Sequence, residues 1–459
     1  MYTYDTIVAP ASAAGQGAVA VVRLSGPCAL PILRRIWHPA RTGALAPRRL
    51  YLGTVCDPES GAPIDRALAV AMPAPKSFTG EDVAEIHCHG GVFLVRRIVA
   101  AALNAGARMA EPGEFSRRAF LNGRIDLTEA EAIADLIAAQ SEGAVAQALA
   151  QLNGALSAKV HAMREQVLAI EAYLEVQIDF NDEDLALPDT KEIDSRCARL
   201  FADLKSLHDS FARGRLMRTG ASTAIIGKPN VGKSSLLNLL LGVERAIVTP
   251  IPGTTRDVIE DAIKVGTYSL ILQDGAGIRD TNDVVERIGV ERTRANAEGA
   301  DLLIAVFDAS RPLESEDREV LEIARNRPTL AALNKVDLPR QLSPGDLRRL
   351  GFASEIVEIS ATRGDGLDQL REKLAEILEG LSGERQADSV AISRERHRAA
   401  LDDAMSAIGA ARDALARKAP PEIVALDVKT AARSLAAITG EVTSEDVLDV
   451  IFREFCIGK

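Results

Sequence analysis

Short apolar runs separated by turn residues dominate the beginning of this chain. Three of them are Val19–Leu24, Ala67–Ala71 and Val83–His87, and Gly and Pro residues lie between them. Apolar runs of this length that end at turn residues are typical of β-strands. We therefore predict a compact α+β domain over residues 1–120.

A helical pattern replaces the strand-like pattern after residue 120. Thr128 and Glu131 have the spacing of a capping box, which predicts the start of a long alanine-rich helical region. Apolar side chains recur every three or four positions in this region and predict one continuous stripe, formed by Leu149, Leu152, Leu156, Val160, Met163, Val167, Ile170 and Leu174. Packing of this stripe inside a helical bundle is the simpler interpretation, and packing against a helix of a second protomer is the alternative.

A third pattern begins near residue 215, where strand-like and helical segments alternate until Gly380. This alternation is typical of an α/β domain, so residues 216–380 form a predicted insertion between two helical parts, residues 121–215 and 381–459. The chain is thus predicted to be a multidomain protein of α/β and helical domains. Helical patterning returns after the insertion at Ser393–Ala416, Val424–Ile438 and Ser444–Phe455, the last with a start signal at residues 443–446.

Residues 227–234, with the sequence Gly-Lys-Pro-Asn-Val-Gly-Lys-Ser, join a predicted strand to a predicted leucine-rich helix. Two glycines allow backbone N–H groups to surround a polyphosphate, Lys233 supplies a positive charge, and Ser234 offers a hydroxyl to Mg²⁺. A glycine turn in an ordinary α/β domain is the alternative, and the argument needs the rest of a nucleotide site. The predicted phosphate contacts are Asn230, Val231, Gly232, Lys233, Ser234 and Ser235.

Three later segments complete a predicted GTP site. One follows a strand that ends near Asp274, a carboxylate that can hold Mg²⁺ through water. Another contains Asp337, whose carboxylate accepts hydrogen bonds from guanine but would face adenine without matching donors. The third, which begins at Ser360, lies where GTPases contact the guanine oxygen. The predicted contacts are Asp274, Gly275, Ala276, Gly277, Asn334, Lys335, Asp337, Ser360, Ala361 and Thr362.

The segment between the first two motifs resembles the switch I of the TrmE-Era-EngA-Septin-like GTPases. This resemblance makes Thr255 the second protein ligand of Mg²⁺, beside Ser234. Ras-like enzymes orient the attacking water with a glutamine after Gly277, whereas this chain has Ile278, which cannot form that hydrogen bond. Another group must therefore complete catalysis. The predicted switch contacts are Thr249, Pro250, Ile251, Pro252, Gly253, Thr254 and Thr255.

Members of that group with an asparagine in the phosphate loop use a monovalent cation for this purpose. Asn230 has that position, so the resemblance implies a K⁺ ion bound by its side chain, nucleotide oxygens and loop carbonyls. K⁺ suits a roomy cage of carbonyl oxygens, because such a cage replaces its loosely held water. The alternative role of Asn230 is to brace the loop through hydrogen bonds. The implied K⁺ ligands are Asn230, Thr249, Ile251 and Thr254.

Further motifs lie at both ends and in the middle of the chain, at residues 5–9, 77–82, 89–91, 112–115, 119–123 and 455–459. Together they resemble the MnmE family of bacterial tRNA-modification GTPases, also called TrmE. The Cys-Ile-Gly-Lys ending and the helical flanks distinguish this family from its GTPase relatives. Gly275 is a difference, because the family usually has a threonine there, and we expect the glycine to loosen the switch.

The resemblance implies a tetrahydrofolate site in the N-terminal domain, which would also form a homodimer. A carboxylate can accept two N–H bonds from a pterin ring, and cations can bind the carboxylates of the folate tail. Without the resemblance, Arg23 and Arg124 would be solvated surface charges. The matching positions are Arg23, Glu81, Arg124 and Lys459.

Two further residues have candidate catalytic roles. Glu286 matches the family glutamate that orients the attacking water through a bridging water, and an ordinary first-turn helix carboxylate is the alternative. Cys456 is either a functional thiol close to the folate or a small buried anchor for the C-terminus. Both alternatives for Cys456 stay open at this point.

The resemblance also implies a reaction and partners. The chain would be a K⁺-dependent GTPase that acts with the FAD-binding protein MnmG, in a heterotetramer or larger complex. The two would add an aminomethyl or carboxymethylaminomethyl group at C5 of the wobble uridine of certain tRNAs, with a formyl-tetrahydrofolate as one-carbon donor. The alternatives are a ribosome-assembly GTPase like Era or EngA and a folate-dependent transferase with a regulatory G domain. The second G domain of EngA and the KH-type tail of Era have no counterpart in the sequence pattern.

Composition agrees with a globular protein of about three domains, because the 459 residues are 47% hydrophobic and 26% charged. The apolar runs are too short for a membrane span and no signal-peptide pattern occurs, so we expect a cytoplasmic location. Five scattered cysteines fit reduced thiols, and His87-Cys88-His89 is better explained as a strand end than as a metal site. The net charge of −11 requires tRNA to contact a local basic patch or a partner's surface.

Overall fold

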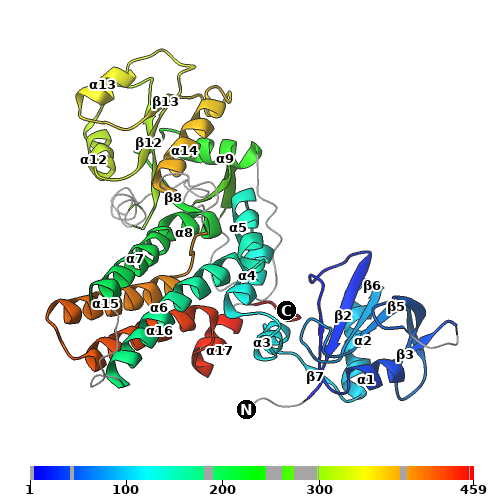
Figure 1. The fold of residues 1–459 in the computed structure, drawn as a ribbon. Helices are drawn as coiled ribbons and strands as arrows, with labels where there is room; N and C mark the ends of the chain where they lie inside the picture. Colours follow the sequence, from blue (N-terminus) through cyan, green and yellow to red (C-terminus); the bar gives the residue numbers. More distant parts are fainter. Residues whose placement is uncertain are drawn as a thin grey trace. The chain divides into compact units, whose positions relative to one another are not determined.

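The computed structural model describes residues 5–41, 46–179, 190–243, 261–272, 297, 299–382, 390–453 and 455–459. The described residues divide into two compact units (Figure 1). Unit 1 contains the residues up to Ala134 and those from Ala436 to Lys459, and unit 2 contains described residues between Asp135 and Leu435.

Unit 1 is built around a sheet with the strand order β3-β4-β5-β6-β2-β1-β7. All neighbouring strands are antiparallel except β1 and β7, which are parallel. The strands confirm the three predicted runs, which lie in β2, β5 and β6. Their bounds are β1 Ile7–Pro10, β2 Val19–Ser25, β3 Trp37–Pro39, β4 Tyr51–Cys56, β5 Pro63–Met72, β6 Val83–His89 and β7 Arg108–Met109.

Two helices, α1 (Ala29–Ile36) and α2 (Val92–Asn104), pack on this sheet and share one apolar core with it. Alternation along β2 decides which side chains enter that core. Val22 and Leu24 are buried in it, so Arg23 between them lies on the opposite face of the sheet. The fold thus places a cationic side chain on the face that these helices do not cover.

The remainder of unit 1 is helical. The helices are α3 (Glu114–Leu121), the first half of α4 (Leu127–Ala138) and α17 (Glu445–Arg453). Apolar side chains of α4 and α17 form a small core with Phe455. The predicted helix start at residues 443–446 is confirmed, because Ser444 Oγ accepts a hydrogen bond from the Val447 N–H at 3.4 Å.

The predicted capping box at Thr128 and Glu131 is wrong by two residues. Asp126 caps α4, since its Oδ1 accepts from the Glu129 N–H at 2.9 Å while Glu129 Oε2 accepts from the Asp126 N–H at 2.8 Å. This reciprocal pair is a capping box with an aspartate in place of serine or threonine. Thr128 and Glu131 are instead fully buried within the first turns of the helix.

Replacing Asp126 by Ala is expected to destabilise unit 1 by about 1 kcal/mol, the usual cost of losing an N-cap acceptor. The Asp126→Asn variant is the matched control, because its side-chain oxygen can still cap the helix. Chemical denaturation followed by circular dichroism measures both variants. Equal loss in the two variants would show that the charge of Asp126, and not the cap, is what stabilises the helix.

Unit 2 contains a helical part whose long helices pack side by side, with α7 in contact with both α6 and α15. The predicted continuous stripe is wrong, because α5 ends at Leu152 and α6 begins at Ala155, with Asn153 and Gly154 between them. Leu149 is 43% exposed, while the stripe residues of α6 are buried. The bounds are α5 Glu142–Leu152, α6 Ala155–Asp179, α7 Thr190–Asp209, α8 Phe211–Thr219, α15 Glu395–Ala416 and α16 Pro421–Thr439.

A second sheet, with strand order β13-β12-β11-β8-β10-β9, follows α8 in the chain. Its strands are parallel except for the antiparallel pair β9 and β10, and helices cover both faces with separate apolar cores. The strands are β8 Ala221–Ile226, β9 Asp261–Val265, β10 Tyr268–Leu272, β11 Leu302–Asp308, β12 Thr329–Asn334 and β13 Ile356–Glu358. The helices are α9 Lys233–Val243, α12 Ser315–Ala324, α13 Pro344–Arg349 and α14 Leu367–Ser382.

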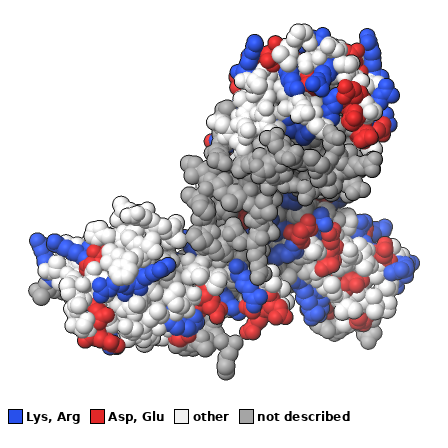
Figure 2. All heavy atoms as spheres, turned by 180° about the vertical axis from the view of Figure 1, so that it is seen from behind, with Lys and Arg blue, Asp and Glu red and all other residues white. Residues whose placement is uncertain are grey.

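This sheet confirms the predicted P-loop α/β fold between two helical stretches of the chain. Acidic and basic side chains are interspersed over the face drawn in Figure 2. Among the helices of the described segments, none combines the length and hydrophobicity that a membrane span requires.

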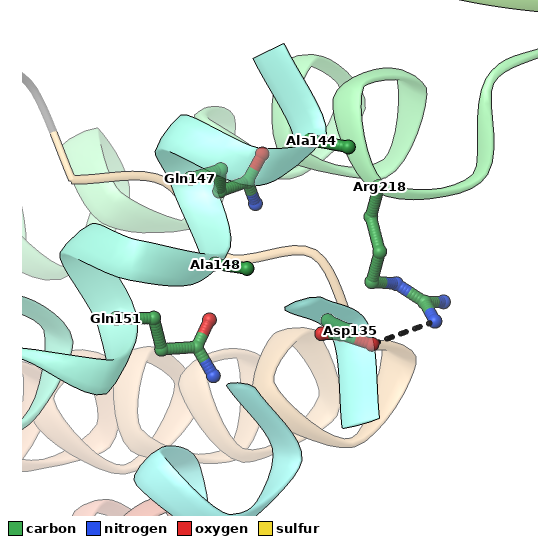
Figure 3. A pocket seen from close by; sticks show the side chains of 6 residues that line it. All are labelled: Asp135, Ala144, Gln147, Ala148, Gln151 and Arg218. Atoms are coloured by element: carbon green, nitrogen blue, oxygen red, sulfur yellow. Dashed lines mark ion pairs between the residues drawn. The ribbon is translucent and has the colours of Figure 1, made fainter. Parts of the chain in front are cut away.

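Asp135 and Arg218, on two helices that precede the α/β domain, form an ion pair (Figure 3). Asp135 of α4 accepts a hydrogen bond at 2.7 Å from Arg394, which immediately precedes α15, and lies 3.7 Å from Arg218 of α8. Both ends of the α/β domain are therefore anchored to one carboxylate of the helical part. We expect this anchor to keep the entry and exit of the domain close together.

Candidate nucleotide site and N-terminal polar site

The loop between β8 and α9 is curled around the Lys233 side chain. Lys233 Nζ donates hydrogen bonds of 2.8 Å to the carbonyl oxygens of Gly227 and Lys228, and burial lowers its pKa. Among the described residues, backbone carbonyl oxygens rather than a carboxylate therefore hold the ammonium group. Such a cation is positioned to bind an anionic oxygen at the N-terminus of a helix.

Asn334 fastens this loop to the segment predicted to select the base. It stands at the buried end of β12, and its Nδ2 donates to the Val231 carbonyl at 2.8 Å. Its Oδ1 accepts from the Ala361 N–H at 2.9 Å. Gly232 has φ +97°, and a Cβ there would lie 2.3 Å from Asn334 Nδ2, so only glycine fits. One amide thus joins the phosphate loop to residues 360–362.

Lys335 makes a second connection. Its Nζ donates to the Asn230 carbonyl at 2.6 Å and to Asp308 Oδ2 at 2.7 Å. Burial of Asp308 acts to raise its pKa, but the hydrogen bonds from Lys335 and Ser310 outweigh burial and keep the pKa low. The ionised Asp308 therefore holds Lys335 against the loop.

Asp337 lies beside Ser360 at the same end of the sheet. Ser360 Oγ donates to Asp337 Oδ1 at 2.7 Å, and this hydrogen bond lowers the pKa of Asp337. The Ser360 hydroxyl is also 3.1 Å from that of Thr362. An ionised carboxylate in this position accepts hydrogen bonds and donates none, which is the requirement for recognising guanine N1–H and N2–H₂.

Lys228 connects the phosphate loop to α12, a contact that the sequence patterns did not predict. Its side chain is only 7% exposed, and its Nζ lies 2.8 Å from Asp317 and 2.9 Å from Glu314 at the start of α12. Burial acts to lower its pKa, yet these two carboxylates outweigh burial and raise it. The capping box of α12 carries the signal of a helix start, but nothing in the sequence pairs that box with the phosphate loop.

In unit 1, Arg23 lies between two aromatic rings and a carboxylate. Its Nε donates to Glu85 Oε1 at 2.8 Å, and its guanidinium carbon is 5.7 Å from the ring centroids of Phe78 and Phe115. Lys459 is close by: burial and then the charge of Arg23 lower its pKa, while the charge of Glu85 acts in the opposite direction. Phe115 contacts both residues, because its ring lies beside the Arg23 guanidinium and its N–H donates to the Lys459 carbonyl.

The C-terminal residues reach this place because they dock on the segment before α3. The Phe115 N–H donates to the Lys459 carbonyl at 3.1 Å, and Ile457 pairs with Pro112. Gly458 has φ +100°, and a Cβ there would lie 2.0 Å from the Pro10 carbonyl oxygen, so the tail passes against β1. Cys456 is half-buried in this docked tail.

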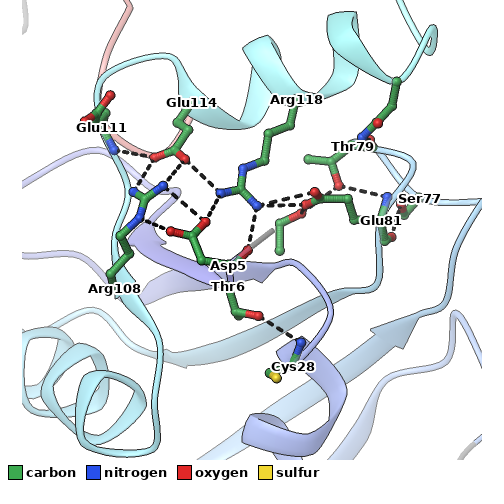
Figure 4. Close-up of polar contacts among 12 residues, drawn as sticks. Asp5, Thr6, Cys28, Ser77, Thr79, Glu81, Arg108, Glu111, Glu114 and Arg118 are labelled. Atoms are coloured by element: carbon green, nitrogen blue, oxygen red, sulfur yellow. Dashed lines mark hydrogen bonds and ion pairs between the residues drawn. The ribbon is translucent and has the colours of Figure 1, made fainter. Parts of the chain in front are cut away.

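Glu81 lies in the loop before β6, and its carboxylate is directed at Arg118 (Figure 4). Its Oε2 accepts from the Ser25 hydroxyl at 2.7 Å and from Arg118 Nη1 at 3.2 Å. Ser25 is two residues after Arg23 on β2. This strand therefore positions two candidate folate residues, Arg23 directly and Glu81 through the Ser25 hydroxyl. Arg124 is exposed and lies near Gly80, the residue before Glu81, because a Cβ added to Gly80 would be 3.2 Å from Arg124 Cγ.

Family models match nearly the whole chain, as the GTP-binding protein TrmE N-terminus over residues 6–124 and as the MnmE helical domain over residues 127–456. A tRNA modification GTPase MnmE of Natranaerobius thermophilus is 42% identical over 100% of both chains. The chain belongs to the MnmE family. Its MnmE relatives in Heliobacterium modesticaldum and Chloroflexus aurantiacus are 44% and 45% identical, with at least 99% of each chain covered.

Two solved structures are also similar to part of this chain. The G domain of the T. maritima FeoB iron transporter is 27% identical and covers 34% of the chain, with a TM-score of 0.25. An Aquifex aeolicus Era structure is 28% identical and covers 41%, with a TM-score of 0.26.

Several predicted site residues lie outside the described residues. Those within them fall into two groups, the phosphate loop with the base-selecting segments in unit 2 and the folate candidates in unit 1. Ser234 and Ser235 are exposed in the first turn of α9. The positions outside the described residues are Thr249, Pro250, Ile251, Pro252, Gly253, Thr254, Thr255, Asp274, Gly275, Ala276, Gly277 and Glu286.

The histidines that flank Cys88 pair with carboxylates. His87 Nε2 is 3.3 Å from Glu85, and His89 Nδ1 is 2.8 Å from Asp65. Cys88 points to the other side of β6, where its thiol donates to the Ala20 carbonyl, and burial raises its pKa to about 11. Within the described residues these three side chains do not converge on one point.

Proposed function

We propose that this MnmE-family chain hydrolyses GTP and, with MnmG, adds an aminomethyl or carboxymethylaminomethyl group at C5 of the wobble uridine of certain tRNAs. The family match along the full chain carries this proposal, because its relatives are named tRNA modification GTPases. The GTPase part has its own support. Asn334 and Lys335 fasten the proposed base-selecting segment to the phosphate loop, so one connected structure would bind both ends of a nucleotide.

Mg²⁺ would be held by Ser234, by Thr255 and by phosphate oxygens. The fit is chemical: Ser234 presents a hydroxyl at the first turn of α9, and Mg²⁺ prefers hard oxygen ligands. When bound, the metal neutralises charge on the β- and γ-phosphates. Lys233 adds a cation on the same side, held by loop carbonyls until phosphate oxygens replace them.

K⁺ would bind at Asn230, completed by carbonyls of Thr249, Ile251 and Thr254. The backbone of Asn230 has φ +64°, and its carbonyl is occupied by Lys335. Its side chain is exposed, and we assign its amide oxygen as a ligand of the ion. We assign the orientation of the attacking water to Glu286, through a bridging water.

In unit 1, a formyl-tetrahydrofolate would be the one-carbon donor. The carboxylate of Glu81 suits the N–H groups of a pterin ring, and the adjacent cations Arg23 and Lys459 suit the carboxylates of the tail. Arg124 lies next to the Glu81 loop and would add a further contact. The docked tail also brings Cys456 close to this region, where we propose it as a functional thiol.

The proposed partners are a second copy of the chain, joined through the N-terminal domain, then MnmG with its FAD, and tRNA. The proposed location is the cytoplasm.

The proposed domain limits are residues 1–120, 121–215, 216–380 and 381–459. Contacts between α5 and the β9–β10 hairpin, including the 2.8 Å pair of Glu142 and Lys264, would supply a path by which the G domain moves the helices.

Turnover of GTP by the purified chain in KCl, compared with NaCl at equal ionic strength, tests the GTPase proposal. We expect K⁺ to accelerate hydrolysis by roughly a factor of ten or more, because a cation in the place of an arginine finger stabilises transition-state charge. K⁺ should also promote dimerisation of G domains in the presence of a transition-state analogue. Equal slow rates in the two salts would reject the K⁺ site and would require a catalytic group from a partner protein.

A further inference from the structure

A network of ionic side chains lies beneath Glu81 and is centred on Arg118 of α3 (Figure 4). The Arg118 side chain is 2% exposed, although arginine is rarely buried unless it is paired. Its Nη2 donates to Asp5 Oδ1 at 2.7 Å and to Glu114 Oε1 at 2.9 Å, and its Nη1 donates to the Asp5 carbonyl at 2.9 Å. The other side of the guanidinium faces Glu81.

A second arginine fixes the partners of Arg118. Arg108 donates to both carboxylate oxygens of Asp5 and to both of Glu114. Burial of Asp5 and of Glu114 acts to raise their pKa values, but the hydrogen bonds from the two arginines outweigh burial and lower them. Asp5 and Glu114 are therefore held ionised, and the guanidinium plane of Arg118 is fixed from two sides.

Glu81 is the one carboxylate of this group that Arg108 does not contact within the described residues. Arg118 Nη1 reaches both of its oxygens, at 3.2 and 3.3 Å, while Ser25 donates to Oε2 at 2.7 Å. A carboxylate has about four acceptor positions, so donors on one side are compatible with further hydrogen bonds to a ligand. Arg118 and Ser25 thus orient Glu81 without enclosing it, since the Glu81 side chain keeps 17% of its surface exposed.

We propose that Arg118 is a positioning residue that aims the carboxylate of Glu81 at the pterin ring of the folate. The inference rests on the proposed N-terminal function. A guanidinium is required because its planar fork binds three carboxylates in fixed directions, which the point charge of lysine does not reproduce. Arg118 touches Glu81 and not the ligand, so its effect on folate binding passes through Glu81.

The test measures 5-formyltetrahydrofolate binding to the full chain by isothermal titration calorimetry. Arg118→Lys keeps the charge and loses the fork, and we expect affinity to fall by roughly tenfold or more. Arg117→Lys is the matched control, because the neighbouring side chain on the same helix pairs with Asp449 at 2.8 Å and not with Glu81. Its affinity should stay within about twofold of the wild type.

A double-mutant cycle with Glu81→Gln separates positioning from a general structural role. If Arg118 acts through Glu81, adding Arg118→Lys to Glu81→Gln should lower affinity by less than about twofold. A further loss as large as that in the wild-type background would overturn the proposal, as would unchanged affinity in Arg118→Lys itself. Absence of binding by the wild-type chain would instead reject the proposed folate function, and the inference with it.

Asp5→Asn serves as a second variant if Arg118→Lys does not fold, which thermal unfolding followed by circular dichroism detects. Asp5 holds Arg118 through both its carboxylate and its backbone carbonyl, and its side chain is 33% exposed. We expect a severalfold loss of folate affinity in the wild-type background and almost none in the Glu81→Gln background. Equal losses in both backgrounds would overturn the proposal.

Discussion

Replacing Asp337 by Asn is expected to lower GTP affinity by roughly a hundredfold or more and to create binding of xanthosine triphosphate. The Asp337 carboxylate accepts from guanine N1–H and N2–H₂, and the hydroxyl of Ser360 keeps its pKa low. The amide of asparagine presents one N–H₂ group, which opposes the donors of guanine and suits the C2 carbonyl of xanthine. Fluorescent-nucleotide titration with both triphosphates measures the change.

Asp368→Asn is the control for this substitution, because Asp368 is an exposed carboxylate in the first turn of α14. It removes the same charge from the same domain without touching the predicted base site. GTP binding should remain within about twofold of the wild type. If Asp337→Asn kept full GTP affinity and gained none for xanthosine triphosphate, the guanine contact would have to be assigned elsewhere.

Replacing Asn230 by Ala is expected to abolish the stimulation of GTP hydrolysis by K⁺ while GTP affinity changes little. The amide oxygen is the proposed K⁺ ligand, whereas the Asn230 carbonyl that binds Lys335 belongs to the backbone and is retained. The turnover ratio between KCl and NaCl should fall from roughly ten or more to about one. Single-turnover hydrolysis at saturating GTP separates this loss from any change in binding.

Asn230 also has φ +64°, a conformation that asparagine adopts more readily than alanine. Asn230→Asp is therefore a useful companion, because it keeps an oxygen ligand at this position and adds a charge. We expect it to retain part of the K⁺ response. A full K⁺ response in Asn230→Ala would contradict the assigned ligand, even if hydrolysis by the wild type depends on K⁺.

Local patterns predicted the elements that carry the nucleotide site. The apolar runs before Gly227 and before Asn334 are strands because their side chains are buried on both faces of a parallel sheet, which leaves a continuous hydrophobic sequence. The phosphate loop follows the first of these strands at the predicted residue. The MnmE resemblance, found from the motifs at both ends, was likewise confirmed.

What the sequence did not predict depends on contacts between distant residues or on the choice among similar local signals. Arg118 contacts Asp5 across 113 positions in the chain, and no local pattern distinguishes it from the less buried Arg117 beside it. At the start of α4, Asp126 competes with Thr128 for the cap, and burial of Thr128 decides the outcome. The break after Leu152 is similar, because leucine spacing alone ignores the Asn153-Gly154 pair.

The most direct test of the central proposal is nucleoside analysis of tRNA by mass spectrometry after incubation with this chain, an FAD-loaded MnmG, a one-carbon folate, a nitrogen donor and GTP. We predict a C5 aminomethyl or carboxymethylaminomethyl group on the wobble uridine. A nonhydrolysable GTP analogue in place of GTP should prevent its formation. Unmodified uridine in the complete mixture, with GTP hydrolysis proceeding normally, would contradict the account and leave this chain a GTPase with another purpose.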